Sequence, residues 1–231
     1  VGLVGYISIS SMRDEMEKQI EESQMLLAET ASEQVQQFFK NAMGVIKLTA
    51  QLSAVKDVSS IPFISEEFKG IPREMDAEKR SIMNDVIVRY GDFRYMEQVT
   101  PDVGKNIVIE PWAFQLDLKE MDFGHRDWFT GAIDTLDAYL SEVYISSSLG
   151  QPVVAISHPV LDDRANLVAV WMGALTLDRL NKLCEQLTFG ETGRVYLVDD
   201  KGTLAAHQNQ ELTREVIKVL DVPMVQEAMG G

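Results

Sequence analysis

Cysteine and histidine are scarce in this chain. Its 231 residues contain one cysteine, Cys184, and three histidines. A single cysteine excludes a disulfide within the chain. Cys184 falls at an apolar spacing with Leu180, Leu183 and Leu187, which favours a buried structural thiol. The histidines are far apart in the sequence and no metal-ligand spacing is present, so we expect no metal ion.

Catalytic signatures are also absent from the sequence. It has no glycine-rich phosphate loop, no His-Glu-x-x-His pair and no Gly-x-Ser-x-Gly turn. We therefore expect a binding module with no catalytic residues and no cofactor. A hydrolase or another enzyme stays open as an alternative, which turnover by the purified chain would support.

Basic residues are outnumbered. The chain has 21 Lys and Arg against 36 Asp and Glu, a formal net charge of -15. Nucleic-acid binding needs clustered basic side chains that neutralise phosphates, so we expect no nucleic-acid partner. The same acidity argues against a protein lying flat on an anionic membrane. The alternative is that the charge only keeps the surface soluble.

A long hydrophobic run is missing, although residues 1–10 are apolar and uncharged. Ten residues are too few to cross a bilayer, which needs about 20. They also lack the basic segment of a signal peptide. We interpret them as the end of a transmembrane helix, and a buried strand is the alternative.

Proline is absent from residues 12–55, which read as one helix roughly 65 Å long. Apolar residues recur there at helical spacing, beginning with Met12, Met16 and Ile20. The first half has a narrow apolar stripe, which predicts pairing with a second copy of the chain. The second half has a broader apolar face, which predicts packing on the domain. Packing of the whole helix on its own domain is the alternative.

Two later passages predict β-hairpins. Strand-like residues 93–100 and 105–109 flank one Asp/Gly turn, and residues 194–198 and 203–207 flank another. Each hairpin follows a helical segment, so we infer two related modules in tandem, split near 189–193. The fold class is therefore α/β, in the α+β sense, with antiparallel sheets.

Three helical segments and a loop complete the reading. Residues 58–72 contain two prolines and read as a loop, and residues 76–90 read as a helix that Asp76 caps. Residues 178–187 and 212–220 read as further helices. One hairpin and a helix cannot close a sheet, so the second module looks incomplete.

The stretch from residue 124 to 178 is the most informative. Arg126 and Trp128 open a short helical piece, and strand-like runs follow at 139–147, 153–160 and 167–176. Such a meander predicts an antiparallel sheet with the Arg126 helix across one face. A guanidinium beside aromatic rings suits a small carboxylate, which it can bind through two parallel hydrogen bonds.

These motifs resemble those of a known family. The order is a long helix, Arg-x-Trp-Phe at 126–129, Val-Ala-Ile-Ser-His-Pro-Val at 154–160 and Tyr-Leu-Val-Asp-Asp-Lys-Gly at 196–202. This order resembles the double Cache sensor domains of bacterial and archaeal chemoreceptors and sensor histidine kinases. The resemblance implies two PAS-like modules along a long helix, in a membrane-anchored receptor whose sensor domain is periplasmic or extracellular.

The resemblance also implies a division of the chain. Residues 1–10 would end a transmembrane helix and residues 11–56 would form a stalk helix that dimerises. Residues 57–188 would be the membrane-distal, ligand-binding Cache module, and residues 189–231 a truncated membrane-proximal module.

Site residues follow from the same resemblance. Arg126 and Trp128 match the pair that holds the ligand carboxylate in amino-acid-binding members. Phe129 stands where a tyrosine is usual, Tyr144 matches a strand tyrosine, and Ser146 replaces an acidic residue.

The amine half of that family motif is lacking. The acid that binds the ligand ammonium would fall within residues 173–175, where nothing is acidic. A buried ammonium without a partner costs several kcal/mol, so we expect a simple organic acid or another small anion. His158, at a strand end, is a further ligand-binding candidate, with a structural polar contact as its alternative.

We therefore predict the ligand-binding sensor domain of a chemoreceptor or histidine kinase. Ligand closure would shift the long helix against its partner in a homodimer. The alternative is a ligand-free structural ectodomain that responds to a partner protein.

Overall fold

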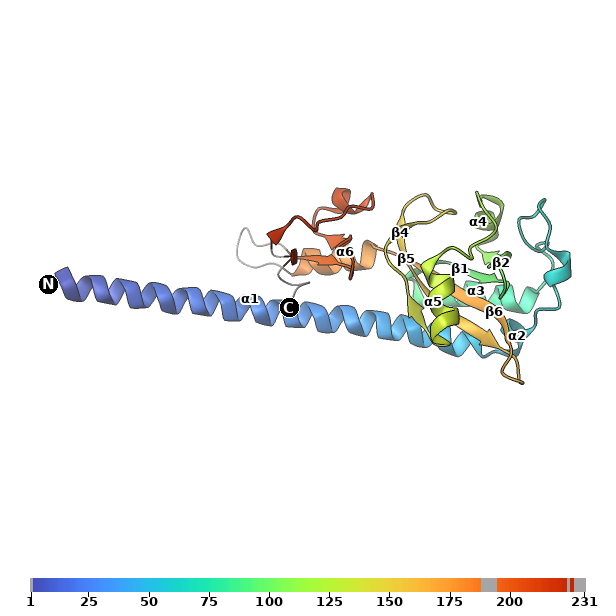
Figure 1. The fold of residues 1–231 in the computed structure, drawn as a ribbon, viewed down its shortest axis with the longest axis horizontal. Helices are drawn as coiled ribbons and strands as arrows, with labels where there is room; N and C mark the ends of the chain where they lie inside the picture. Colours follow the sequence, from blue (N-terminus) through green and yellow to red (C-terminus); the bar gives the residue numbers. More distant parts are fainter. Residues whose placement is uncertain (1, 188–194, 224, 227–231) are drawn as a thin grey trace.

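The computed structural model describes residues 2–187, 195–223 and 225–226. One helix, α1 (Gly2–Ala50), runs along the molecule, with the main sheet at its C-terminal end (Figure 1). Residues 2–10 are helical and continuous with the predicted long helix, so the alternative of a buried strand is wrong. The helix ends five residues early, where Leu52 turns extended and the short helix α2 (Ser53–Lys56) follows. Among the described helices, none is both long and apolar enough to cross a membrane.

The connection from α2 to the sheet contains a short 3-10 helix, η1 (Ile61–Phe63), and α3 (Ala77–Tyr90). The predicted capping role of Asp76 is wrong. Asp76 precedes α3 with a φ of 54°, and its side chain makes no capping bond. Its carboxylate instead accepts hydrogen bonds from Lys79 Nζ (2.6 Å) and Ser60 Oγ (2.8 Å). Asp76 is thus in the left-handed conformation instead of the extended one typical of an N-cap, and its carboxylate pairs with a buried lysine.

The main sheet has six antiparallel strands in the order β2-β1-β6-β5-β3, with β4 also paired to β5. The predicted first hairpin and the predicted meander are thus confirmed, and pairing of β1 with β6 joins them into one sheet. Helix α4 (Trp112–Leu116) follows β2, and α5 (Asp127–Thr135) precedes β3. The strands are β1 (Phe93–Val99), β2 (Asn106–Glu110), β3 (Tyr139–Leu140), β4 (Tyr144–Ile145), β5 (Pro152–Leu161) and β6 (Leu167–Thr176).

The run at 139–147 is two short strands and not the single strand that we predicted. Between β3 and β4, side chains replace part of the backbone ladder. Ser141 Oγ accepts from the N–H of Ala155 (2.8 Å), and Asp127 accepts from the N–H of Glu142 (2.7 Å). The edge of the sheet is therefore held by side chains from α5 and from the segment itself.

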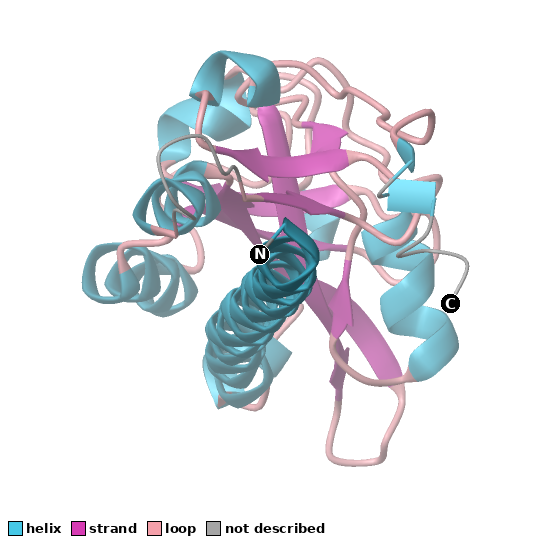
Figure 2. Ribbon diagram, turned by 90° about the vertical axis from the view of Figure 1, so that its left-hand side faces the viewer, coloured by secondary structure: helices cyan, strands magenta, loops and turns pink. Residues whose placement is uncertain are grey.

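Two apolar clusters lie on opposite faces of the main sheet. The cluster under α1, α2 and α3 contains Ile46, Met83 and Trp171, all fully buried. The cluster under α4 and α5 contains Trp128 and Phe123. Figure 2, with α1 pointing toward the reader, shows that helix lying against the sheet. Strands β5 and β6 therefore contact α1 through one set of side chains and α5 through the other.

A small second sheet lies beside the middle of α1 (Figure 1). It is reached through α6 (Asp178–Gln186) and contains β7 (Tyr196–Val198) and β8 (Leu204–His207), which confirms the second hairpin. Cys184 of α6 is fully buried, as expected, and burial raises the pKa of its thiol to about 11. The predicted module boundary at 188/189 falls within residues 188–194, which are outside the described part of the chain.

The helix predicted at 212–220 is not present. A 3-10 helix, η2 (Gln210–Thr213), ends there, and the following segment pairs with β8 instead. The N–H of Leu204 donates to the carbonyl of Ile217 (2.8 Å), and Thr203 bridges to Lys218. Pairing with the free edge of β8 thus overrides the helical spacing of the apolar residues.

Candidate ligand-binding site

Strand β1 places neighbouring side chains on opposite faces of the main sheet. Tyr95 belongs to the cluster under α5 and Met96 to the cluster under α1. Glu97 therefore lies on the α5 face. Gln98, the next residue, donates from Nε2 to the carbonyl of Val55 (2.7 Å) at the α1 face. One strand thus carries both a site residue and a contact to the helical layer.

Arg126 lies directly before α5, at the edge of the same cluster. Its Nη2 donates to Glu120 Oε1 at 2.6 Å, and its guanidinium carbon lies 5.2 Å from the centre of the Tyr144 ring. The side chain is 22% exposed, whereas the Nε atom is buried and has no hydrogen-bond partner in the described part of the chain. The guanidinium therefore has a donor aimed inward and still free.

Glu97 is a buried carboxyl close to this guanidinium. It is 1% exposed, and its Oε1 has no partner among the residues that the structure places. Burial raises the pKa of the Glu97 carboxyl to about 8, against the pull of the Arg126 charge and with the help of the Glu120 charge. Glu97 is therefore mostly neutral at pH 7.

Two tyrosines and a serine complete the polar part of the site. The hydroxyls of Tyr95 and Ser146 lie 3.2 Å apart, and Ser146 Oγ also accepts from the N–H of Leu149 (3.2 Å). The Tyr144 hydroxyl is buried and lacks a partner within the described residues. Burial raises the pKa of Tyr95 and of Tyr144, so both stay protonated and can donate.

Trp128 and Phe129 follow Arg126 in the chain and belong to the buried apolar cluster on this face of the sheet. They are 1% and 4% exposed, and their rings meet edge to face with centroids 6.2 Å apart. The Trp128 carbonyl accepts from Ser157 Oγ of β5 at 2.6 Å, which fixes the start of α5 on the sheet. The α5 backbone is thus anchored next to the guanidinium.

His158 lies away from these residues. Its Cα pairs with Trp171 of β6, which packs on α1, so His158 is on the opposite face from Arg126. Its Nδ1 contacts the carbonyl of Pro159, and its Nε2 lies 3.9 Å from Asp137. This is the structural contact named above as its alternative. Five of the six candidate side chains lie together on the α5 face, and His158 does not.

The polar cluster combines donors and an acceptor without partners. Arg126 Nε and Tyr144 Oη are donors, and Glu97 Oε1 is an acceptor or, when protonated, part of a donor. Buried polar groups are normally hydrogen-bonded, so three unpaired atoms in one place need an explanation. The carboxylate of a small ligand could accept hydrogen bonds from these donors, and its carbon atoms could contact Trp128 and Phe129.

Sequence reasoning missed Glu97, Tyr95 and Glu120. The period-2 spacing of Tyr95 and Glu97 in a strand-like run puts both on one face, which is a usable signal. That spacing does not show which residues the face meets. The neighbours of Glu97 are fixed by the pairing of β1 with β6, where Glu97 lies opposite Met172, and these two strands are far apart in the sequence. Glu120 lies in an irregular segment, and no sequence pattern marks it.

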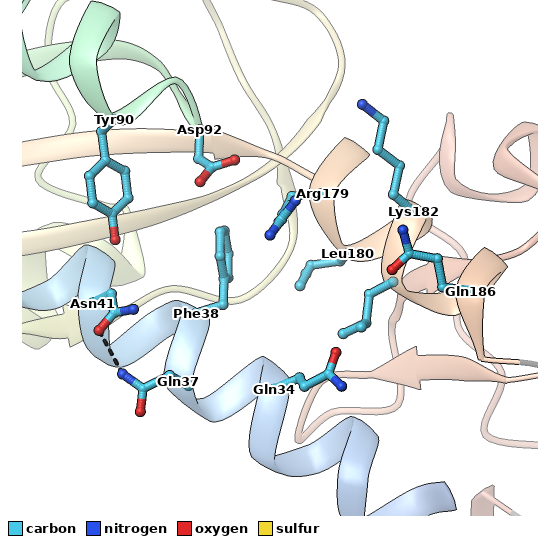
Figure 3. A pocket seen from close by; sticks show the side chains of 11 residues that line it. Gln34, Gln37, Phe38, Asn41, Tyr90, Asp92, Arg179, Leu180, Lys182 and Gln186 are labelled. Carbon is cyan, nitrogen blue, oxygen red and sulfur yellow. Dashed lines mark hydrogen bonds between the residues drawn. The ribbon is translucent and has the colours of Figure 1, made fainter.

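A cleft of about 370 Å³ lies elsewhere in the molecule, between α1, the end of α3 and α6 (Figure 3). Phe38 and Asn41 of α1 line it together with Tyr90, Arg179 and Lys182. None of the unpaired buried polar atoms found in the described residues belongs to its lining. We therefore place the candidate site on the α5 face of the main sheet.

A metal site is not formed by the described side chains, among which no group of three or more His, Cys, Asp or Glu converges. The chemistry of the cluster is accordingly that of a guanidinium, a carboxyl and hydroxyls. Such a set can hold an organic ligand through hydrogen bonds and charge.

Solved structures similar to this one are ligand-binding domains of chemoreceptors. PctB of Pseudomonas aeruginosa in complex with L-Gln has a TM-score of 0.61 and 20% identity, over 85% of this chain and 71% of that one. Tlp3 of Campylobacter jejuni in complex with L-valine has a TM-score of 0.61 and 18% identity, over 91% and 78%. PctC of Pseudomonas aeruginosa in complex with GABA has a TM-score of 0.60 and 19% identity, over 80% and 74%. At these identities the likeness establishes the fold.

Sequence comparison gives the family. A curated relative, the methyl-accepting chemotaxis protein McpG of Pseudomonas putida, is 30% identical over 95 residues, which are 41% of this chain and 15% of McpG. The chain thus corresponds to a small part of that receptor. The Cache domain family, dCache_1, matches residues 9–227, nearly the whole chain. The chain therefore belongs to the dCache_1 family of Cache domains, which sense ligands and do not catalyse reactions.

Proposed function

We propose that this chain is the extracytoplasmic ligand-binding domain of a transmembrane chemoreceptor. The main-sheet module binds a small molecule with a carboxylate, and Arg126 holds that carboxylate. The observation that carries the proposal is the buried, unpaired Nε of Arg126, whose guanidinium lies against the Tyr144 ring. A guanidinium N–H that is buried and unpaired can donate a charge-assisted hydrogen bond to a carboxylate. The relatives support a small-molecule ligand, since their structures contain amino acids or GABA.

The first part of α1 supports a homodimer. Met16 and Ile20 lie one helical turn apart and are 57% and 43% exposed. Two large apolar side chains on one exposed helix face favour pairing with the same face of a second copy. Binding at the main sheet would then change how the two long helices meet.

Thermal unfolding with a ligand panel tests the carboxylate site. Succinate, butyrate, L-valine, L-glutamine and 4-aminobutyrate would each be added to the wild-type chain, to Arg126→Ala and to Arg89→Ala. Arg89 is a matched control because its side chain is 81% exposed on α3. A ligand at 100 times its Kd stabilises by about 2.7 kcal/mol, which raises Tm by roughly 5–10 °C for a chain of this size.

We expect at least one of these carboxylates to stabilise the wild type and Arg89→Ala but not Arg126→Ala. A domain that responds to a partner protein would show no shift with any of them. Equal shifts in all three proteins would place the ligand elsewhere and contradict the role of Arg126.

A further inference from the structure

The cleft between α1, the end of α3 and α6 lies on the opposite side of the main sheet from Arg126. Its lining residues Phe38, Tyr90 and Leu180 belong to or pack on the cluster under α1, and none of its lining residues belongs to the cluster under α5. Its volume of about 370 Å³ is within the range of small-molecule sites. The cleft is therefore a space of ligand size that the proposed function does not use.

The inner wall of this cleft is apolar. Phe38 of α1 and Tyr90 of α3 are half-buried, and Leu180 of α6 is buried. The Tyr90 ring is held against Phe93 of β1, with ring centroids 5.4 Å apart. Aromatic rings that border a concave space gain favourable contacts when an apolar body covers them.

Amide side chains surround the apolar wall. Gln34, Gln37 and Asn41 follow one face of α1 at intervals of three and four residues, and Gln186 of α6 lies across the cleft from them (Figure 3). Gln37 Nε2 donates to Asn41 Oδ1 at 2.6 Å. Because an amide both donates and accepts, this rim can hold polar substituents without adding charge.

Arg179, in the first turn of α6, is the basic residue directed into the cleft. Figure 3 shows its guanidinium on the side of Phe38 and Asp92, whereas the amino group of Lys182 points away. Asp92 is the acid of the lining, but no ion pair joins it to Arg179, and Arg179 is absent from every ion pair formed within the described part of the chain. The guanidinium therefore retains its donors for an anion, and carboxylates match its planar geometry.

We propose that this cleft binds a second small molecule, a carboxylate that carries an apolar ring. Arg179 holds the carboxylate, Phe38 and Tyr90 contact the ring, and the amides of α1 face its polar substituents. The proposal goes beyond the sensing site on the α5 face and does not depend on it. Because α6 leads from the main sheet to the second sheet, a ligand that touches α1 and α6 would fasten this connection to the long helix.

The two halves of the cleft contribute separately to affinity. Arg179 is exposed, so solvent screens its ion pair, and its charge changes Kd by about fivefold or less. Covering the ring wall supplies the larger part, about tenfold or more in Kd. Ligands that keep one half and lack the other therefore measure each contribution.

Two-dimensional ¹H–¹⁵N NMR titrations give the affinity and the location of binding together. Benzoate, benzamide and acetate would be added to the wild type, Arg179→Ala, Arg126→Ala and Arg164→Ala. Benzamide keeps the ring without the charge, and acetate keeps the charge without the ring. Arg179 is exposed, so its substitution is expected to leave the fold intact. Arg164 is the matched control, because it is exposed in the β5–β6 turn and outside the lining of the cleft.

We expect benzoate to shift the side-chain amide signals of Gln37 and Asn41 in the wild type. Arg126→Ala and Arg164→Ala should show the same shifts at those signals with the same Kd. Arg179→Ala should raise the Kd of benzoate about two- to fivefold and leave that of benzamide unchanged. Acetate should shift the same signals about tenfold more weakly than benzoate.

Three outcomes would overturn the proposal. Absence of shifts at Gln37 and Asn41 with every ligand would show that the cleft does not bind this class. Equal Kd values for benzoate in the wild type and Arg179→Ala would remove the anion contact. Shifts confined to the α5 face and abolished in Arg126→Ala would place benzoate in the other site alone. That last result would support the carboxylate site of the proposed function, so the two proposals fail separately.

Discussion

Trp171 and Thr49 join the central strand of the sheet to the long helix. The indole Nε1 of Trp171, on β6, donates to Thr49 Oγ1 of α1 at 2.9 Å, and Trp171 is fully buried. Thr49 Oγ1 in turn donates to the carbonyl of Val45 (2.8 Å). The bond lies on the α1 face of the same strand whose other face contributes to the candidate site. It is therefore a direct polar link between the main sheet and α1.

Thr49→Val should destabilise the chain by about 1–3 kcal/mol. The substitution keeps the shape of the side chain but leaves the buried indole N–H without an acceptor. Unfolding in urea at constant pH measures the change in free energy. Thr49→Ser retains the hydroxyl and should lose less than Thr49→Val. Equal losses in the two variants would mean that packing of the threonine methyl, and not the bond to Trp171, is the cause.

The ligand-free chain should lose stability as pH rises because of Glu97. The pKa of Glu97 is raised in the fold from 4.5 to about 8, so the folded state binds a proton that the unfolded state releases. The contribution is full below pH 4.5 and is lost as pH rises to about 8, with a slope of up to about 1.4 kcal/mol per pH unit.

Denaturant unfolding between pH 5 and 8 checks this effect as the difference between wild type and Glu97→Gln. The difference isolates Glu97 from other groups such as His158, whose pKa burial lowers and which acts in the opposite direction. Parallel stability curves for the two proteins would show that the Glu97 carboxyl is not desolvated in solution.

Glu120→Gln should strengthen carboxylate binding. Glu120 Oε1 occupies Arg126 Nη2 at 2.6 Å and so competes with a ligand carboxylate for the guanidinium. Because Glu120 is 37% exposed, solvent screens the pair and its loss is worth less than about 1 kcal/mol. Kd for a bound carboxylate should therefore fall about two- to fivefold in calorimetric titrations. A higher Kd would instead assign Glu120 the role of orienting Arg126.

Lys79→Met should destabilise the chain by about 3–5 kcal/mol. The Lys79 side chain is 1% exposed and pairs with Asp76 at 2.6 Å, and its Nζ also donates to the Asp57 carbonyl (2.7 Å). Removing the cation leaves a mostly buried carboxylate unpaired. Lys56→Met is the matched control, because its partner Asp163 is 93% exposed and such pairs contribute about 1 kcal/mol or less. Similar losses in both variants would contradict the buried-pair explanation.

Met16→Cys should form a disulfide-linked dimer under mild oxidation if the first part of α1 pairs with a second copy. The chain is suited to this test because Cys184, its single cysteine, is fully buried. Lys18→Cys is the control, since Lys18 lies two residues along the same helix and therefore on another face. If the chain is part of the membrane-anchored receptor proposed above, the experiment is best made in that receptor, where tethering raises the effective concentration. Equal cross-linking at both positions would argue against a defined helix pair.

Elements with strong local signals could be predicted from the sequence. Both hairpins have an Asp/Gly turn between strand-like runs, and the strands formed there. The meander that carries Tyr144, and the helix that follows Arg126, were also expected. The grouping of Arg126, Tyr144 and Ser146 on one face agrees with the family resemblance, which supplied those three positions.

Features that depend on distant contacts could not be predicted. Asp76 pairs with Lys79 and does not cap α3. The segment after η2 pairs with β8 and does not form a helix. His158 falls on the α1 face because strand register decides the face, and one residue of register reverses it. Glu97 becomes a site residue only when β1 pairs with β6.

The length of α1 has a geometric consequence. Its 49 residues extend about 74 Å, and the main sheet contacts it near the C-terminal end. The helix is thus held by Trp171 and its neighbours near one end, and most of its length extends away from the main sheet. A tilt of one degree at the sheet would displace the opposite tip by roughly 1.3 Å, by the same arithmetic of rise per residue. Ångström-scale travel at the remote end therefore requires hardly any rearrangement where the strands lie.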